Sequence, residues 1–171
     1  ITESRDVMVW GRDEKKMDKY KQHMEKIGFE VTFCKSPHEV ASECNLIITA
    51  TASKDYVLSN DDILEGTHIN AIGSDTPSKR ELGPGIIEKA DLVIADSIEQ
   101  CKYRGEIACS IRDGNLNLDN VVELGDVLSG KISGRESKSQ ITVSDLTGVA
   151  VQDIKIADSV FKKFMEDKNE I

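Results

Sequence analysis

Four polar stretches, each directly after a short apolar run, carry the residues of this sequence that could do chemistry. They span residues 11–13, 49–54, 70–79 and 145–148. Small residues in such stretches let a flat ligand approach the backbone, and the free N–H groups at helix starts bind phosphate. The stretches are therefore typical of a nucleotide-binding crevice, although threonine- and glycine-rich segments also occur as plain turns.

The apolar runs alternate with segments of helical character, and these elements must position the four stretches. Strands are predicted at residues 7–10, 29–33, 46–50, 67–73, 92–95 and 141–143. Helices are predicted at residues 14–27, from residue 36, at 86–90, 106–111 and 121–128, and after residue 148. The alternation predicts the α/β class, with a mostly parallel sheet whose carboxyl strand ends bring the four stretches to one edge.

Local signals mark where individual helices begin and end. Asp13 is a candidate N-cap for the helix that Gly28 should stop, and Ser36 followed by Pro37 is typical of a helix start. The last predicted helix has one apolar stripe, which a packing partner should cover. The stripe consists of Ala150, Ile154, Ala157, Phe161 and Phe164.

Composition excludes several classes of function. The 171 residues include 22 Lys and Arg against 31 Asp and Glu, a formal net charge of −9. This balance argues against nucleic-acid and anionic-membrane partners, because both require a positive surface. No apolar run approaches the ~20 residues of a membrane span, and residues 1–6 lack a signal-peptide pattern. We expect a soluble, cytoplasmic protein.

The cysteines and histidines do not indicate a metal site. None of the four cysteines forms a Cys-x-x-Cys pair or has a histidine at zinc-ligand spacing, and the three histidines are scattered. We therefore expect reduced cysteines packed in the interior, and no bound metal.

The longest polar stretch carries a specific motif. Residues 66–81 read Gly-Thr-His-Ile-Asn-Ala-Ile-Gly-Ser-Asp-Thr-Pro-Ser-Lys-Arg-Glu. They closely resemble the pattern G-x-H-x-N-A-x-G-x-D-x-P-x-K-x-E-L of the ornithine cyclodeaminase/μ-crystallin family. Weaker similarities follow in the same order at residues 105–107, 134–137 and 145–153, so the resemblance covers essentially the whole chain.

The resemblance implies a Rossmann-like NAD(P)-binding domain joined to a second domain for substrate binding and dimerisation. It also implies an NAD(P)-dependent oxidoreductase that transfers hydride to or from the α-carbon of an amino acid or its imine. Ornithine cyclodeaminase-like and alanine dehydrogenase-like activities remain open, because the residues that sense side-chain length lie mainly in the second domain. Two alternatives remain, namely a non-catalytic small-molecule-binding protein like μ-crystallin and a generic Rossmann-like dehydrogenase or methyltransferase domain.

The resemblance also assigns roles to single residues. Asp75 matches the catalytic aspartate, where a carboxylate beside the substrate's amino nitrogen can relay its proton, and Thr147 matches a position near the substrate. Residues alone would favour an Asx turn at Asp75 and equally allow a helix N-cap at Thr147. The positions that match cofactor-lining residues are Thr51, Asn70, Ala71, Ile72, Lys79 and Leu146.

The end of the first strand bears on which cofactor is bound. NAD-preferring sites place an acid there for the ribose 2′-hydroxyl, whereas an arginine nearby accommodates the 2′-phosphate of NADP. This sequence has Gly11 at the expected acid position and Arg12 after it. Arg12 therefore favours NADP over NAD, although the adjacent Asp13 leaves the choice open.

Two parts of the family pattern are absent from the sequence. It contains no Gly-x-Gly-x-x-Ala fingerprint, and no segment matches the substrate domain that normally precedes it. We therefore expect residues 1–147 to form an incomplete cofactor domain whose first, central strand is missing. Residues 148–171 should form a helix that returns towards the substrate domain. The strands at 7–10 and 46–50 should then pair directly, pair through another chain, or flank a gap, and this chain alone should be inactive.

Overall fold

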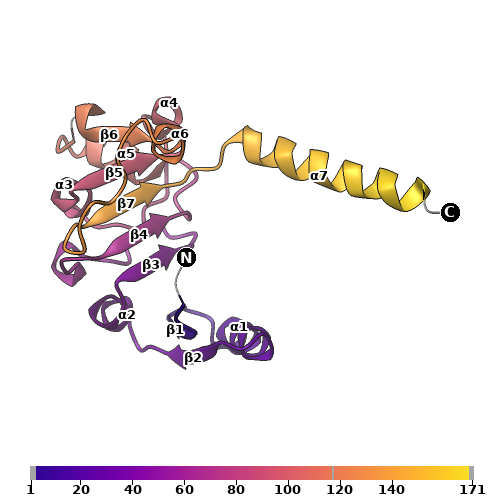
Figure 1. The fold of residues 1–171 in the computed structure, drawn as a ribbon. Helices are drawn as coiled ribbons and strands as arrows, with labels where there is room; N and C mark the ends of the chain where they lie inside the picture. Colours follow the sequence, from indigo (N-terminus) through magenta and orange to yellow (C-terminus); the bar gives the residue numbers. More distant parts are fainter. Residues whose placement is uncertain (1–2, 117, 170–171) are drawn as a thin grey trace.

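Parallel strands in two separate sheets form the framework of the structure, a computed structural model that describes residues 3–116 and 118–169 (Figure 1). The strands are β1 (Asp6–Val9), β2 (Glu30–Phe33), β3 (Leu46–Thr49), β4 (His68–Ala71), β5 (Leu92–Ala95), β6 (Val121–Glu123) and β7 (Thr142–Asp145). The helices are α1 (Glu14–Lys26), α2 (Pro37–Glu43), α3 (Ile86–Lys89), α4 (Ile98–Cys101), α5 (Gly105–Arg112), α6 (Leu124–Leu128) and α7 (Ala150–Asn169). The predicted α/β class is confirmed.

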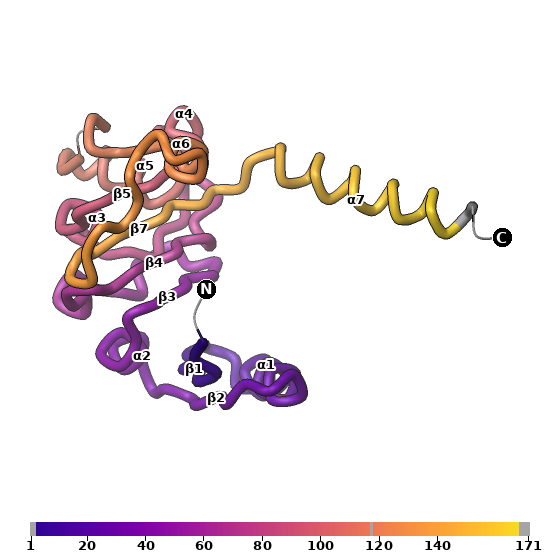
Figure 2. Tube along the Cα trace, in the orientation of Figure 1, coloured from indigo at the N-terminus to yellow at the C-terminus, as the bar shows by residue number. Residues whose placement is uncertain are grey.

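The larger sheet has the order β3-β4-β7-β5-β6, and β1 pairs with β2 in the smaller one. Every pairing between these strands is parallel. Figure 2 shows β7, although last in the sequence, running between β4 and β5. The carboxyl ends of β3, β4 and β7 therefore lie next to one another.

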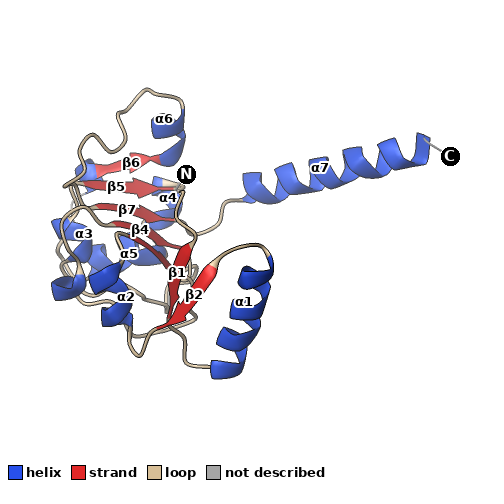
Figure 3. Ribbon diagram, turned by 60° about the horizontal axis from the view of Figure 1, so that its bottom comes forward, coloured by secondary structure: helices blue, strands red, loops and turns tan. Residues whose placement is uncertain are grey.

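A gap separates the two sheets, which is one of the three arrangements expected for a missing central strand. Among the described residues β1 pairs with β2 alone and β3 with β4 alone. The two-stranded sheet and α1 lie apart from the five-stranded body in Figure 1, and Figure 3 shows α1 running beside β2. On β3, Leu46 is 43% and Ile48 is 61% exposed. Such exposure is unusual for a parallel sheet, whose faces are normally both covered. The outer edge and one face of β3 are therefore open.

The core lies on the other face of the five-stranded sheet. Four neighbouring strands each contribute one side chain to it, in register and at most 4% exposed. These side chains are Ile47, Ile69, Val93 and Val143. Side chains of α2, α3 and α5, including Ile107, complete the same cluster. Burying one such side chain contributes about 1.5–3 kcal/mol, so this layer fixes the positions of the strand ends.

The predicted capping signals are confirmed. The Asp13 carboxylate accepts a hydrogen bond from the backbone N–H of Lys16 at 3.1 Å, and Gly28 follows α1 with a φ of 89°. Ser36 caps α2, and Pro37 is its first residue. These local contacts explain why α1 and α2 begin where the sequence indicates.

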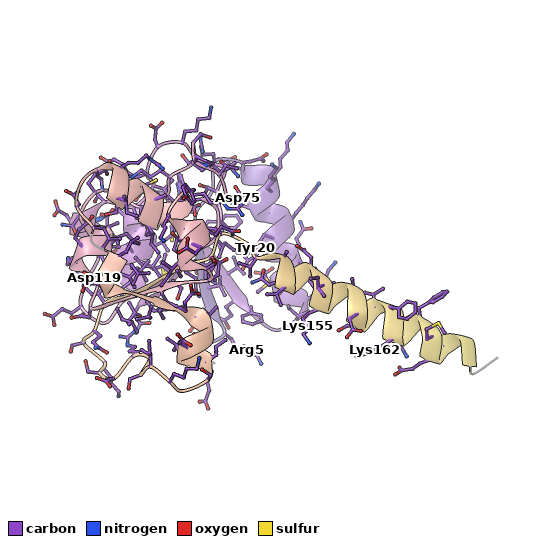
Figure 4. All side chains as sticks on the ribbon, turned by 90° about the horizontal axis from the view of Figure 1, so that it is seen from above. Arg5, Tyr20, Asp75, Asp119, Lys155 and Lys162 are labelled. Carbon is purple, nitrogen blue, oxygen red and sulfur yellow. The ribbon has the colours of Figure 1, made fainter. Side chains whose placement is uncertain are left out.

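Three elements differ from the prediction. The helix expected at residues 121–128 begins as strand β6, whose β-branched valines pair with β5, and only its second half is helical. Helix α4 was not predicted, although Ser97 caps it by accepting the backbone N–H of Gln100. Helix α7 has the predicted apolar stripe, yet all of its described side chains are exposed. Figures 1 and 4 show it projecting from the body, with Lys155 and Lys162 in open space.

Two further findings concern the whole described chain. None of its described helices has both the length and the apolarity needed to cross a bilayer. Its four cysteines are free thiols, with Cys34, Cys101 and Cys109 buried and Cys44 half-buried. Three of the four are thus packed in the interior, as expected.

Candidate functional site

The strand ends of β3, β4 and β7 are joined by backbone hydrogen bonds beyond the sheet itself. The N–H of Ile72 donates to the carbonyl of Thr49, and the N–H of Leu146 donates to the carbonyl of Ala71, both at 2.9 Å. The turns that follow these strands therefore lie side by side. The structure thus brings the predicted residues Thr51, Ile72 and Leu146 to one edge.

Glu81 holds the first two of these turns together. Its side chain is completely buried. One carboxylate oxygen accepts the backbone N–H of Thr51, and the other accepts the N–H of Gly73 at 2.9 Å. A Cβ added at Gly73 would collide with the backbone of Thr51 and with this carboxylate, so the close approach requires glycine.

A second buried acid fixes the segment that carries Glu81. The carboxylate of Glu106, on α5, accepts the backbone N–H of Glu81 at 2.7 Å and that of Leu82 at 3.1 Å. Burial raises the pKa of Glu106, and these two hydrogen bonds act in the opposite direction. Glu106 thereby couples the position of α5 to the turns after β3 and β4.

A third buried acid, Asp145 at the end of β7, fixes the start of α5. It accepts the backbone N–H of Ile107 at 2.9 Å. Burial raises its pKa to about 7, and hydrogen bonds from backbone amides at the start of α5 oppose this rise. Gly105 opens the helix with a φ of 89°, and a Cβ there would collide with the Asp145 carboxylate. Asp145 therefore links β7, and with it the Leu146 turn, to the other two acids.

Asp75 has a different environment from these acids. Its side chain is 52% exposed and accepts a hydrogen bond from Lys79 Nζ at 2.5 Å. This hydrogen bond is the main reason that the pKa of Asp75 is lowered, and Arg104 contributes. Figure 4 places Asp75 at the periphery of the body. An Asx turn onto residue 77 is excluded because Pro77 has no N–H to donate.

Asp75 and the Leu146 turn belong to the same edge of the sheet. Asp75 lies four residues beyond Ala71, whose carbonyl holds Leu146. The predicted acid and the predicted cofactor residues are thus not on opposite sides of the molecule. Ala71 itself points into the core, with 1% exposure, so only its backbone is available at the edge.

The Thr147 side chain is held inside the fold. It is 3% exposed, and its hydroxyl donates to Asp96 Oδ1 at 3.1 Å and accepts from Gln100 Nε2 at 2.6 Å. It therefore does not cap α7, which begins at Ala150. Sequence reasoning missed Asp96 and Gln100, although Asp96 directly follows β5 and so carries the same strand-end signal as the other stretches.

The Asn70 side chain is oriented by a neighbouring histidine. His68 Nε2 lies 3.2 Å from Asn70 Oδ1, and His68 Nδ1 lies 2.6 Å from Thr142 Oγ1. Burial is the main cause that lowers the pKa of His68, so the ring is neutral near pH 7. These two hydrogen-bond partners assign the single ring proton of His68 to Nε2, which donates to Asn70 Oδ1. Nδ1 then accepts from the Thr142 hydroxyl. The amide nitrogen of Asn70 then points away from His68.

Arg12 lies in the loop between β1 and α1. It is exposed, three residues after the end of β1, across the gap from the turns that Glu81 joins. The structure therefore gathers the predicted residues into two groups, with Arg12 on one side of the gap and the remainder on the other. Ile72, in the second group, is 43% exposed.

Two hollows in the described surface lie elsewhere. One, of about 530 Å³, runs along α7, and the other, of about 440 Å³, lies at the amino ends of β3 and β4 beside Arg135. None of the predicted cofactor or substrate residues lines either of them. The candidate residues are therefore assembled at the carboxyl edge of the sheet, away from both of these hollows.

A parallel α/β sheet with polar turns gathered at its carboxyl edge defines a domain of the nucleotide-binding α/β class. Comparison with known proteins then identifies the family. The model of the ornithine cyclodeaminase/mu-crystallin family matches residues 1–168, and the chain belongs to this family.

Individual relatives and solved structures agree. An alanine dehydrogenase of Archaeoglobus fulgidus is 37% identical over 158 residues, which are 92% of this chain and 48% of that protein. An archaeal alanine dehydrogenase, solved as a dimer with bound NAD, is 34% identical with a TM-score of 0.89 over 95% of this chain and 50% of its own. A Δ1-pyrroline-2-carboxylate reductase of Thermococcus litoralis, with NADH and L-proline, is 26% identical with a TM-score of 0.90 over 95% and 51%. The chain spans about half the length of these proteins.

Proposed function

We propose that the protein containing this chain is an NAD(P)-dependent oxidoreductase that transfers hydride to or from the α-carbon of an amino acid or its imine. The observation that carries the proposal is the assembly of the Thr51, Asn70–Asp75 and Leu146 segments at one sheet edge. It is supported by the alanine dehydrogenase with NAD and the pyrroline-2-carboxylate reductase with NADH and L-proline. Alanine dehydrogenase-like and ornithine cyclodeaminase-like chemistry are both within this proposal.

The residues present fit one part of a nicotinamide dinucleotide. Thr51, Asn70 and Lys79 offer polar groups to a ribose or a carboxamide at this edge of the sheet. The N–H groups of Thr51 and Gly73 are taken by Glu81, so these turns would bind through side chains and not through an N–H cradle for phosphate. No Gly-x-Gly-x-x-Ala segment occurs in the sequence, so the pyrophosphate site would come from residues outside this chain.

Asp75 would perform the acid–base step. When bound, a nicotinamide would take the hydride from the α-carbon or return it. The Asp75 carboxylate would hold or accept the proton of the substrate's amino nitrogen and stabilise the cation that forms. The Lys79 ammonium, 2.5 Å away, keeps the carboxylate ionised, and this ion pair must open for Asp75 to contact substrate. Asp96 and Gln100 hold the Thr147 side chain. Thr147 would therefore contribute near the substrate mainly through its backbone.

For the cofactor we propose NADP in preference to NAD. Arg12 is exposed at the end of β1, where a 2′-phosphate would be bound. The competing acid, Asp13, has one carboxylate oxygen engaged in capping α1, which supports the assignment to Arg12. The solved relatives contain NAD or NADH, so this preference depends on Arg12 alone.

We also propose that residues 1–147 are part of the cofactor domain and that residues 148–171 lead to the substrate and dimerisation domain of a homodimer. The exposed apolar face of α7 supports this proposal. Four of its large apolar side chains are each more than 60% exposed, namely Ile154, Ile156, Val160 and Phe161. Such a run of exposed apolar side chains is unusual unless another surface covers it.

The test is an assay of the complete gene product that carries this chain. Alanine, ornithine and cyclic imines would each be tried with both nicotinamide cofactors, and we expect turnover with at least one amino acid or imine. Asp75→Asn should lower kcat by two or more orders of magnitude, about the range of a general acid–base contribution, with cofactor affinity unchanged. Turnover that survives Asp75→Asn would refute the role of Asp75. The chain of residues 1–171 alone is expected to be inactive.

A second candidate is a non-catalytic binding protein. The ion pair between Asp75 and Lys79 at an exposed position favours it, because a surface salt bridge is a sufficient role for both residues. Dinucleotide binding by the complete gene product, without turnover of any amino acid or imine, would support this candidate over the enzyme.

A further inference from the structure

We propose that Glu81 is a positioning residue for the nicotinamide half of the cofactor site. It sets the spacing between the Thr51 and Gly73 turns, so its loss should weaken binding of the whole dinucleotide but not of the ADP-ribose part. This inference rests on the proposed function and extends it to a buried residue that would touch neither cofactor nor substrate.

The geometry of Glu81 is that of a clamp. Its two carboxylate oxygens accept N–H groups from turns that follow two different strands, β3 and β4. Its own backbone is fixed on both sides, since the carbonyl accepts the N–H of Val57 at 2.7 Å and the N–H donates to Glu106 at 2.7 Å. A carboxylate held in this way cannot shift without displacing both turns.

A carboxylate is required because each turn presents a donor. Glutamine keeps one acceptor oxygen, but its NH₂ group would face a backbone N–H and leave two donors in contact. A buried donor without a partner destabilises the arrangement that contains it. The turns after β3 and β4 would then separate. Thr51 lies in the first turn and Asn70 lies just before the second, so the distance between these two side chains would change.

The clamp acts on one half of the site only. The hydrogen bonds described for Glu81 all go to residues of the five-stranded body, whereas Arg12 lies in the loop between β1 and α1, across the gap. In doubly wound folds each half of the sheet binds one mononucleotide. Arg12 and the first sheet would bind the adenosine half, and the turns held by Glu81 would bind the nicotinamide half.

The experiment compares two ligands on the complete gene product. Dissociation constants for the dinucleotide that the wild type prefers, and for the matching ADP-ribose or its 2′-phosphate, would be measured by titration calorimetry. For Glu81→Gln we expect at least tenfold weaker binding of the dinucleotide and less than a twofold change for the ADP-ribose ligand.

Two further variants separate this effect from a loss of folding. Gly73→Ala pushes the same two turns apart while it keeps the carboxylate, and it should give the same selective loss. Asp91→Asn is the control, because Asp91 also accepts a backbone N–H, from Ile141 at 2.7 Å, but at the opposite edge of the sheet. It should change neither dissociation constant.

The outcomes are distinguishable. Equal weakening of both ligands in step with the melting temperature, or no weakening of either, would overturn the role of Glu81 and leave the proposed function intact. A wild type that binds neither nicotinamide dinucleotide would overturn the proposed function itself, and this inference with it. Selective loss in both Glu81→Gln and Gly73→Ala would establish the positioning role.

Discussion

Replacing Asp145 with asparagine should remove a pH dependence from the stability of this domain. Asp145 is 1% exposed, and burial raises its pKa from 3.8 to about 7. Between pH 3.8 and about pH 7, Asp145 is ionised in the unfolded chain but still protonated in the folded chain. The free energy of unfolding therefore falls as the pH rises, by about 1.4 kcal/mol per pH unit. Stability from this group is fully present below pH 4 and is lost as the pH rises through 7.

The size of the effect follows from the same two values. Between pH 5 and pH 8, most of the fall in the free energy of unfolding occurs below pH 7. The contribution of Asp145 to the stability of the wild type should therefore decrease by about 2–3 kcal/mol over this range. Asparagine keeps an oxygen for the N–H of Ile107 and does not ionise. Relative to the wild type, Asp145→Asn should therefore gain about 2–3 kcal/mol of unfolding free energy between pH 5 and pH 8.

The assay is urea-induced unfolding at several pH values, with Ser144→Ala as the control. Ser144 is a buried residue of the same strand, and alanine there changes no ionisable group, so its pH slope should equal that of the wild type. Parallel pH profiles for Asp145→Asn and the wild type would refute the argument that burial keeps Asp145 protonated near neutral pH.

Three further changes have defined outcomes. Gly105→Ala should destabilise the domain by about 2 kcal/mol or more in thermal unfolding, because Gly105 has a φ of 89° and a Cβ would collide with the Asp145 carboxylate. Lys79→Met should raise the pKa of Asp75, since the Lys79 hydrogen bond lowers it, and the acid limb of the pH profile of kcat/KM should move to higher pH. Phe161→Ser, on the exposed face of α7, should weaken dimerisation in sedimentation while the melting temperature of the body changes little. An unaltered acid limb, or an intact dimer, would contradict the respective argument.

The regular elements were predictable because their signals are local. Asp13 and Ser36 cap their helices through bonds to residues three positions away, and the branched runs of β3 and β5 specify strands by themselves. The position of β7 between β4 and β5 was not predictable, because a strand's neighbours depend on packing with distant parts of the chain. Strand β6 was mistaken for helix since its three residues precede a true helical turn.

The edge that gathers the candidate site was predictable, but the residues that hold it together were not. Parallel strands imply that Thr51, Asn70 and Leu146 share one edge. No spacing rule indicates that the Glu81 carboxylate reaches turns that lie 30 and 8 residues before it. Glu81 stands in the family pattern quoted for residues 66–81, but that pattern assigns it no role. Its burial and its two bonds to the neighbouring turns show what it does.

Burial also divides the acids of this edge by what they can do. The carboxylates of Glu81 and Glu106 each accept two backbone N–H groups in the interior, and Asp145 accepts one at 1% exposure. Oxygens engaged in this way hold turns in place and cannot reach a substrate. Asp75 has no such backbone donor from a distant segment among the described bonds, and its partner is the side chain of Lys79. Of these four acids, we therefore propose Asp75 as the one that exchanges a proton with a substrate, while the three buried acids fix the geometry around it.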